Sequence, residues 1–320
     1  MKIGSIVKLI LSIAMLALVL SVTDIETLRR TIAGIPASVA VLAVVGFALT
    51  QALNASKWWI ILNAGGITAR LSDAIKAFFV GSFANVFGFG TVGGDMVRGV
   101  LIAQGQPRKT EAITSVFADR ALGLAVLSLI GVVATAFVGG HHMKPVFVYT
   151  LCGVAAFVFA GWFIGPLLIL RLVRPGNRFR TKVEQISAVF PKRPGAIALV
   201  CAISVAFHLS QITLQWLIAR GIGIDAPFAS MLVTVPFINI LSTLPLSWNG
   251  VGIRENLYIF FLYPEVFSRE QAVAVGAIWL LALTGSSLLG GIISVITGDF
   301  RLVLGRRAPA TGETAGESGS

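Results

Sequence analysis

Long apolar runs separated by short polar segments make up most of the chain. Uninterrupted apolar runs cover residues 6–22, 36–56, 111–138, 145–171, 195–219 and 270–298. Because an α-helix rises about 1.5 Å per residue, each run is long enough to cross a hydrocarbon core about 30 Å thick. The pattern therefore predicts an all-α integral membrane protein with six full transmembrane helices.

The first two runs need separate comment. Residues 6–22 also resemble a cleaved signal peptide, but no convincing small-x-small cleavage site precedes Thr23, which favours a transmembrane helix. The second run begins at Pro36, a residue suited to a helix start. We expect it to end at Lys57, because a charge followed by two tryptophans is typical of a membrane interface.

Two further apolar stretches, 73–104 and 227–264, are interrupted by Gly- or Pro-rich centres and contain charged residues. Irregular backbone at membrane depth is tolerated only where protein or a water-filled cavity satisfies its polar groups. We therefore expect each stretch to form a re-entrant hairpin of two half-helices. A count that scores each hairpin as a span gives eight helices.

The composition excludes a soluble globular protein. Hydrophobic residues make up 56% of the 320 residues and charged residues only 12%, whereas about a quarter of a typical soluble domain is charged. We expect one polytopic membrane domain over residues 1–304, followed by a disordered cytoplasmic tail over 305–320. Cys152 and Cys201 both lie in apolar runs, so neither a disulfide framework nor a metal cluster is expected.

The distribution of positive charge predicts the topology. Lys and Arg number 25 against 14 Asp and Glu, and basic cytoplasmic loops explain this excess without a nucleic-acid partner. Loop 172–194 is strongly basic, which puts both chain termini in the cytoplasm and loops 139–145 and 220–226 outside. Segment 178–190 is mildly amphipathic, and it either attracts anionic lipids at the cytoplasmic surface or reflects the positive-inside rule alone.

The two interrupted stretches also resemble each other. The matching positions are Phe83-Ala84-Asn85 with Phe237-Ile238-Asn239, and Gly93-Gly94-Asp95 and Arg98 with Asn249-Gly250-Val251-Gly252 and Arg254-Glu255. Each stretch follows two spans and precedes a third, which divides the domain into repeats of about 1–138 and 145–300. An odd number of crossings per repeat places the second repeat upside down, as in the inverted repeats of secondary transporters.

The breaks in both hairpins predict an anion-binding site. Glycines before a half-helix let backbone N–H groups face a ligand at the positive end of the helix dipole, and an arginine one turn later adds a bidentate phosphate donor. The candidate substrate-binding residues are Asn85, Gly93, Gly94, Asp95, Arg98, Asp119, Arg120, Asn239, Asn249, Gly250, Gly252, Arg254 and Glu255. The alternative is that the charges of each hairpin only neutralise one another.

Charged side chains at membrane depth are costly and need partners. We expect Asp95 to pair with Arg254 and Glu255 with Arg98, which would hold the two hairpin tips together near the membrane midplane. Asp119, with its neighbour Arg120, either extends a polar cavity or bonds across helices while the arginine snorkels to the interface.

Chemistry beyond these charges is limited. His208, Gln211 and Gln215 share one helix face, which suits either a polar path or hydrogen bonds between helices. No nucleophile–base set, zinc motif or nucleotide-binding fingerprint occurs in the sequence. We therefore expect no catalytic residue, no metal and no cofactor.

Three motifs together resemble a known family. They are Phe-x-Asn followed by Gly-Gly-Asp-x-x-Arg at 83–98, Ala-x-x-Ser-x-x-x-Asp-Arg at 112–120, and Leu-Pro-x-Ser-x-Asn-Gly-x-Gly-x-Arg-Glu at 244–255. Over about residues 5–300 the chain resembles the flippase-like transmembrane family, named for the lysylphosphatidylglycerol synthase transmembrane region, the lipid-flipping half of the bacterial multiple peptide resistance factor. Family members often carry a proline in the first break, where this chain has Gly88-Phe89-Gly90-Thr91.

The resemblance implies a multi-pass protein of the bacterial plasma membrane that moves a lipid between leaflets. We expect the lipid to be anionic or to carry a phosphate headgroup. Lysine transfer is not implied, because a separate soluble domain performs it in the bifunctional members. The alternative is a membrane-embedded lipid-modifying enzyme, or an accessory subunit of a glycolipid or lipid biosynthetic pathway. Such an enzyme would need an acid or base spared from pairing, and the candidates are Asp95, Asp119 and Glu255.

Overall fold

The structure is a computed structural model of the whole chain. It describes residues 25–87, 90–138, 164–178, 193–243 and 250–299, with scattered residues between 17 and 21, between 146 and 161 and between 180 and 191, and Ser247. The predicted tail, 305–320, lies outside the described residues.

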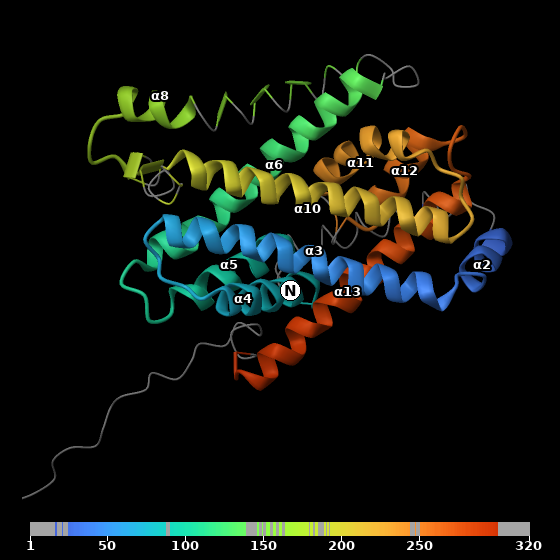
Figure 1. Cartoon of the computed structure of the whole chain (residues 1–320), viewed down its shortest axis with the longest axis horizontal. Helices are drawn as coiled ribbons and strands as arrows, with labels where there is room; N and C mark the ends of the chain where they lie inside the picture. Colours follow the sequence, from blue (N-terminus) through green and yellow to red (C-terminus); the bar gives the residue numbers. More distant parts are fainter. Residues whose placement is uncertain are drawn as a thin grey trace, which may run out of the picture.

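Every regular element in this part of the chain is an α-helix (Figure 1). The helices are α2 (Ile25–Ala33), α3 (Ala37–Ala64), α4 (Leu71–Phe87), α5 (Gly90–Ala103), α6 (Lys109–Val138), α8 (Gly165–Leu172), α10 (Pro194–Gly221), α11 (Phe228–Thr243), α12 (Ile253–Leu262) and α13 (Arg269–Ile296). Among them, α3, α6, α10 and α13 are long and apolar enough to cross a membrane. The prediction of an all-helical membrane protein is therefore confirmed.

These four long helices correspond to four of the six predicted spans. The first predicted span, 6–22, lies outside the described residues except for residues 17 and 21, and the fourth, 145–171, is described without gaps only from residue 164 on. Each interrupted stretch forms two helices, α4 with α5 and α11 with α12. The count of six spans and two re-entrant hairpins stays a prediction.

The predicted end of the second span at Lys57 is wrong, because α3 continues to Ala64. Lys57 is 1% exposed and Trp58 is fully buried. The Lys57 ammonium pairs with Asp119 at 2.9 Å, and the Trp58 indole Nε1 donates to the Ser115 hydroxyl at 2.9 Å. Partners on α6 thus hold inside the protein two residues that the sequence pattern assigned to the membrane surface.

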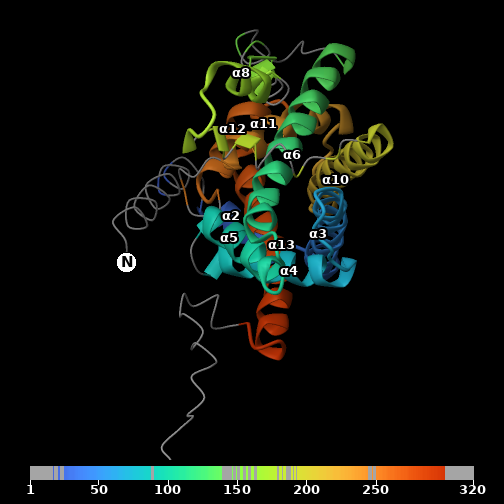
Figure 2. The ribbon, with the colours of Figure 1, turned by 90° about the vertical axis from the view of Figure 1, so that its left-hand side faces the viewer.

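The helices pack in a reciprocal way. Helix α4 packs against α13 and α11 packs against α6, so each hairpin contacts the long helix that follows the other hairpin. Each hairpin also contacts the long helix that follows it, α5 with α6 and α12 with α13. Helices α3 and α10 lie side by side, and α6 and α13 cross them (Figures 1 and 2). This packing lets both hairpins contribute side chains to one interior region.

A close contact between glycines joins α4 to α5. A Cβ added at Gly94 would collide with the carbonyl oxygen of Gly81 and with the side chain of Asn85. The Gly94 N–H donates to Asn85 Oδ1 at 2.8 Å. This contact fixes the start of α5, and with it Asp95 and Arg98 one turn further along.

Candidate functional site

A cavity of about 270 Å³ lies between the two hairpins and the long helices. Its charged lining residues are Lys57, Asp95, Arg98, Asp119, Arg120 and Arg254. Uncharged polar residues complete much of the wall, among them Gln51, Asn54, Asn85, His208, Gln211 and Asn239. Residues separated by about 200 positions in the chain therefore line one space.

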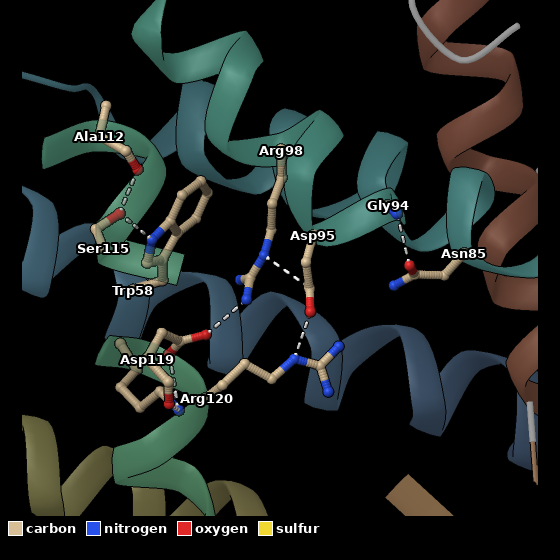
Figure 3. Close-up of polar contacts among 10 residues, drawn as sticks. Trp58, Asn85, Gly94, Asp95, Arg98, Ala112, Ser115, Asp119 and Arg120 are labelled. Carbon is tan, nitrogen blue, oxygen red and sulfur yellow. Dashed lines mark hydrogen bonds and ion pairs between the residues drawn. The ribbon is translucent and has the colours of Figure 1, made fainter. Parts of the chain in front are cut away.

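Five of the charged residues form a connected network (Figure 3). Asp119 on α6 accepts from Arg98 at 3.0 Å through one carboxylate oxygen and pairs with Lys57 at 2.9 Å through the other. Asp95 on α5 pairs with Arg98 at 3.2 Å and with Arg120 at 2.7 Å. Positive and negative groups alternate, so each carboxylate bridges two cations and each cation except Arg98 has a single carboxylate partner.

Aromatic side chains hold Arg98 in place. Its guanidinium lies 4.8 Å from the ring centre of Trp58 and 4.6 Å from that of Phe78, within range of a cation–π attraction. Trp58 is itself fixed by Ser115, whose hydroxyl donates to the Ala112 carbonyl oxygen at 2.7 Å (Figure 3). Arg98 is only 3% exposed, so the first hairpin presents a rigid, largely neutralised arginine to the cavity.

Arg254 has different surroundings. It reaches the cavity from α12 and lies 5.7 Å from the ring centre of Trp279. Within the described residues it forms no ion pair, and its buried Nε has no hydrogen-bond partner. The second hairpin thus brings to the cavity an arginine whose charge is acted on by the adjacent Glu255 but that forms no ion pair with a described carboxylate.

The predicted cross-pairing of the hairpins is wrong. Asp95 pairs with Arg98 and Arg120, not with Arg254. Glu255 accepts the Gly252 backbone N–H at 2.7 Å and packs against α13, where its carboxylate would collide with a Cβ added at Gly276. The reason is local: Gly252 adopts a φ of 80°, and this turn aims its N–H at the side chain three residues later.

The structure brings together a subset of the residues singled out from the sequence. Those that line the cavity are Asn85, Asp95, Arg98, Asp119, Arg120, Asn239 and Arg254. Those that are described but do not line it are Gly93, Gly94, Gly250, Gly252 and Glu255. Asn249 lies outside the described residues. Gly93 and Gly94 were expected before the half-helix but lie inside α5, whereas Gly250 and Gly252 precede α12 and both adopt a φ of 80°.

Sequence reasoning missed Lys57 and Asn54, which both line the cavity from α3. Their spacing of three residues puts them on one helix face, and a polar pair on one face of an apolar helix was the available signal. The face shared by His208, Gln211 and Gln215 is divided: the first two line the cavity, while Gln215 accepts from the Tyr258 hydroxyl. Gln211 Nε2 donates to Thr50 Oγ1 at 2.6 Å, a hydrogen bond between α10 and α3.

These features define a multi-pass membrane protein with a charged cavity between two interrupted helical hairpins. The chain matches the family model described as the lysylphosphatidylglycerol synthase TM region over residues 5–291. This match covers nearly the whole chain, and the chain belongs to that family. No curated protein matches it.

Proposed function

We propose that the protein is a flippase-like lipid transporter of the bacterial plasma membrane, with an anionic or phosphate-bearing lipid as its substrate. The family supports a role in membrane lipid chemistry, since it is named for the transmembrane region of a lipid-modifying protein. In this proposal the cavity is the headgroup site, and both chain termini lie in the cytoplasm.

The observation that carries this proposal is the contrast between the two arginines of the cavity. Arg98 pairs with the carboxylates of Asp95 and Asp119, whereas no carboxylate among the described residues forms an ion pair with Arg254. An uncompensated cation at membrane depth is costly and is expected to be functional. A phosphate oxygen fits this position, because a guanidinium offers paired N–H donors to it.

The transport cycle follows from the same contrast. The headgroup first contacts Arg254 on the second hairpin and then draws Arg120 away from Asp95, which loosens the contact between α5 and α6 and frees the first hairpin to move. Alternating access of this kind needs no nucleotide site.

Reciprocal packing supports an inverted repeat. Helices α3 and α10 both have 28 residues, and the hairpin after each one contacts α13 and α6, respectively. We propose six full spans and two re-entrant hairpins, divided into repeats of about 1–138 and 145–300. The hairpins then enter the membrane from opposite faces and meet at the cavity.

The enzymatic alternative is less well supported. It needs a carboxylate free to act as acid or base, but Asp95 and Asp119 are ion-paired and Glu255 accepts a backbone N–H. These three contacts favour transport over chemistry at this site.

Reconstitution into liposomes with a panel of fluorescent lipids tests the proposal. Wild-type protein should move a phosphate-bearing lipid between leaflets without forming a new lipid species. Arg254→Gln should lower the rate about tenfold or more, and Arg254→Lys should restore only part of it. Arg220→Gln is the matched control, because Arg220 is a half-exposed arginine at the end of α10 that does not line the cavity. A wild-type rate in Arg254→Gln, or a new lipid product, would overturn the proposal.

A further inference from the structure

The cavity wall carries more positive charge than its own carboxylates neutralise. Four cationic side chains line it, Lys57, Arg98, Arg120 and Arg254, and two carboxylates, Asp95 and Asp119. Two positive charges therefore remain among the described lining residues. The carboxylate of Glu255, which neighbours Arg254 in the chain and interacts with its charge, packs against Gly276 of α13 and does not line the cavity.

The two excess charges come from different elements of the cavity wall. One belongs to the network of α3, α5 and α6, in which three cations share two carboxylates. The other is Arg254 on α12, which has no carboxylate partner in the described part of the chain. A ligand that neutralises both charges must carry two negative charges.

Unsatisfied polar atoms give a second, independent indication of a ligand. Apart from Arg98 Nε and Asp119 Oδ1, which take part in ion pairs, five lining residues have a buried side-chain atom without a hydrogen-bond partner in the described structure. These atoms are Asn54 Oδ1, Arg98 Nη1, His208 Nε2, Ser242 Oγ and Arg254 Nε. Buried polar atoms are paired in the great majority of cases, so such a group around one cavity indicates a polar occupant. Both arginines contribute a nitrogen to this group, one from each hairpin.

We infer that the cavity binds a headgroup with two negative charges, a phosphate monoester, in preference to the singly charged phosphate diester of most bilayer lipids. A monoester carries about −1.5 to −2 charge near pH 7 and has three terminal oxygens, enough to contact Arg254 and the Arg98 side together. A diester would leave one cation without compensation. This inference rests on the proposed function and specifies its substrate class.

The test compares two soluble lipids with the same acyl chains. Dihexanoyl phosphatidic acid is a monoester and dihexanoyl phosphatidylglycerol is a diester, so they differ in headgroup charge. Binding to the purified protein in detergent can be followed by tryptophan fluorescence, because Trp279 lies against Arg254 and Trp58 against Arg98. We expect phosphatidic acid to bind about tenfold more tightly at pH 8, which corresponds to about 1.4 kcal/mol.

The pH dependence identifies the charge as the cause. A monoester takes up its second proton with a pKa of about 6, so the preference for phosphatidic acid should shrink toward one as the pH falls to 5. His208 is the titratable side chain that faces the charged network from α10, and the other charged groups are the six named above. Protonating His208 would strengthen anion binding at low pH, the opposite trend, and a His208→Gln variant should keep the pH dependence.

Two variants and one competitor complete the test. Arg254→Gln should lower the ratio of the affinities for phosphatidic acid and phosphatidylglycerol to about one, whereas Arg220→Gln should leave this ratio unchanged. A ratio of affinities measured on one protein sample is insensitive to a loss of folded protein. Inorganic phosphate should compete only at concentrations at least about a hundredfold higher than the lipid; equal potency would mean that free phosphate is the ligand and would overturn the lipid assignment.

The outcomes separate this inference from the proposed function. If phosphatidylglycerol binds as tightly as phosphatidic acid and is moved in an Arg254-dependent way, the charge inference is wrong and the transporter stands. If no lipid is moved between leaflets, or a new lipid species forms, and neither probe binds, both are wrong.

Discussion

Trp59 and Trp216 make the same hydrogen bond in the two halves of the chain. The Trp59 indole Nε1 donates to the Ala69 carbonyl oxygen at 2.8 Å, and Trp216 Nε1 donates to the Ala226 carbonyl oxygen at 2.9 Å. In both cases the acceptor lies 10 positions after the tryptophan. The tryptophans are 157 positions apart (216 − 59), and so are the first residues of α3 and α10 (194 − 37). The turn that leads from each of these helices into its hairpin is therefore built in the same way.

The glycines of the two turns agree with this spacing. Gly66 and Gly223, again 157 positions apart (223 − 66), adopt φ angles of 78° and 83°. When the two halves of the chain are aligned with this offset of 157 positions, Asn85 corresponds to Ser242 and Ser82 to Asn239. All four residues line the cavity. The register differs by three positions from the Phe-x-Asn match seen in the sequence, which is less than one helical turn. The Phe-x-Asn motif and the turns after α3 and α10 thus relate the two halves of the chain by different offsets.

The inverted repeat predicts the sidedness of two loops. Cysteines introduced at Asn177 and at His142, in a chain without Cys152 and Cys201, should be labelled from opposite sides of the membrane. The expected result is cytoplasmic labelling at Asn177 and external labelling at His142, measured with a membrane-impermeant thiol reagent on intact and permeabilised cells. Labelling of both positions from one side would contradict the topology and the inverted repeat with it.

The network around Asp119 should be a major source of stability. Asp119→Asn removes a carboxylate that serves both Lys57 and Arg98, and it leaves two buried cations with too few partners. Removing one partner of a buried ion pair costs about 3–5 kcal/mol. We expect thermal unfolding of the purified protein in detergent to shift down accordingly.

Glu111→Gln is the matched control on the same helix. Glu111 pairs with Arg108, whose side chain is 44% exposed, and an exposed pair contributes about 0–1 kcal/mol. Equal unfolding temperatures for the two variants would show that burial of the Asp119 network contributes nothing beyond a surface ion pair.

Close helix contacts should make two glycines sensitive to substitution. A Cβ at Gly290 on α13 would collide with the Phe79 carbonyl oxygen of α4, and one at Gly94 would collide with α4 as well. Gly→Ala at either position should cost about 1–3 kcal/mol, because the backbone itself would have to move. Gly195→Ala on α10 meets nothing within 4 Å and should be neutral or gain up to about 1 kcal/mol. Unfolding temperatures of the three variants check this ranking.

The sequence was most informative where length and composition decide the structure. Helices α6, α10 and α13 begin and end within two residues of the predicted runs, since an apolar run of this length has few alternatives to a helix in a membrane. The glycine breaks located both hairpins, and their charged residues located much of the cavity wall.

The sequence was least informative where the environment of a charged side chain depends on a partner that is distant in the chain. Lys57 beside two tryptophans has the pattern of a membrane interface, and only Asp119, 62 positions later, turns it into a buried ion pair. Asp95 likewise takes Arg120 of α6 instead of Arg254, because α5 packs directly against α6. Pairing among buried charges depends on helix packing that no local pattern encodes.

The shared cavity makes a final prediction about the two hairpins. Val86 on α4 and Thr243 on α11 both line the cavity, although they are 157 positions apart (243 − 86). Cysteines at these two positions, in a chain without Cys152 and Cys201, should be joined within one chain by a short bifunctional thiol reagent. A bound lipid headgroup should lower the yield, because it occupies the space between the two sulfurs.

Pairing Val86→Cys with Ala229→Cys provides the control for this cross-link. Ala229 lies on the same helix as Thr243 but is only partly buried, and at about 1.5 Å per residue it is about 21 Å away along the axis. This pair should therefore not be joined by the short reagent. Both chains should still react with a monofunctional reagent, which shows that the thiols are accessible. If accessible cysteines at positions 86 and 243 fail to cross-link, the two hairpins do not meet at one cavity, and transport through a shared headgroup site is excluded.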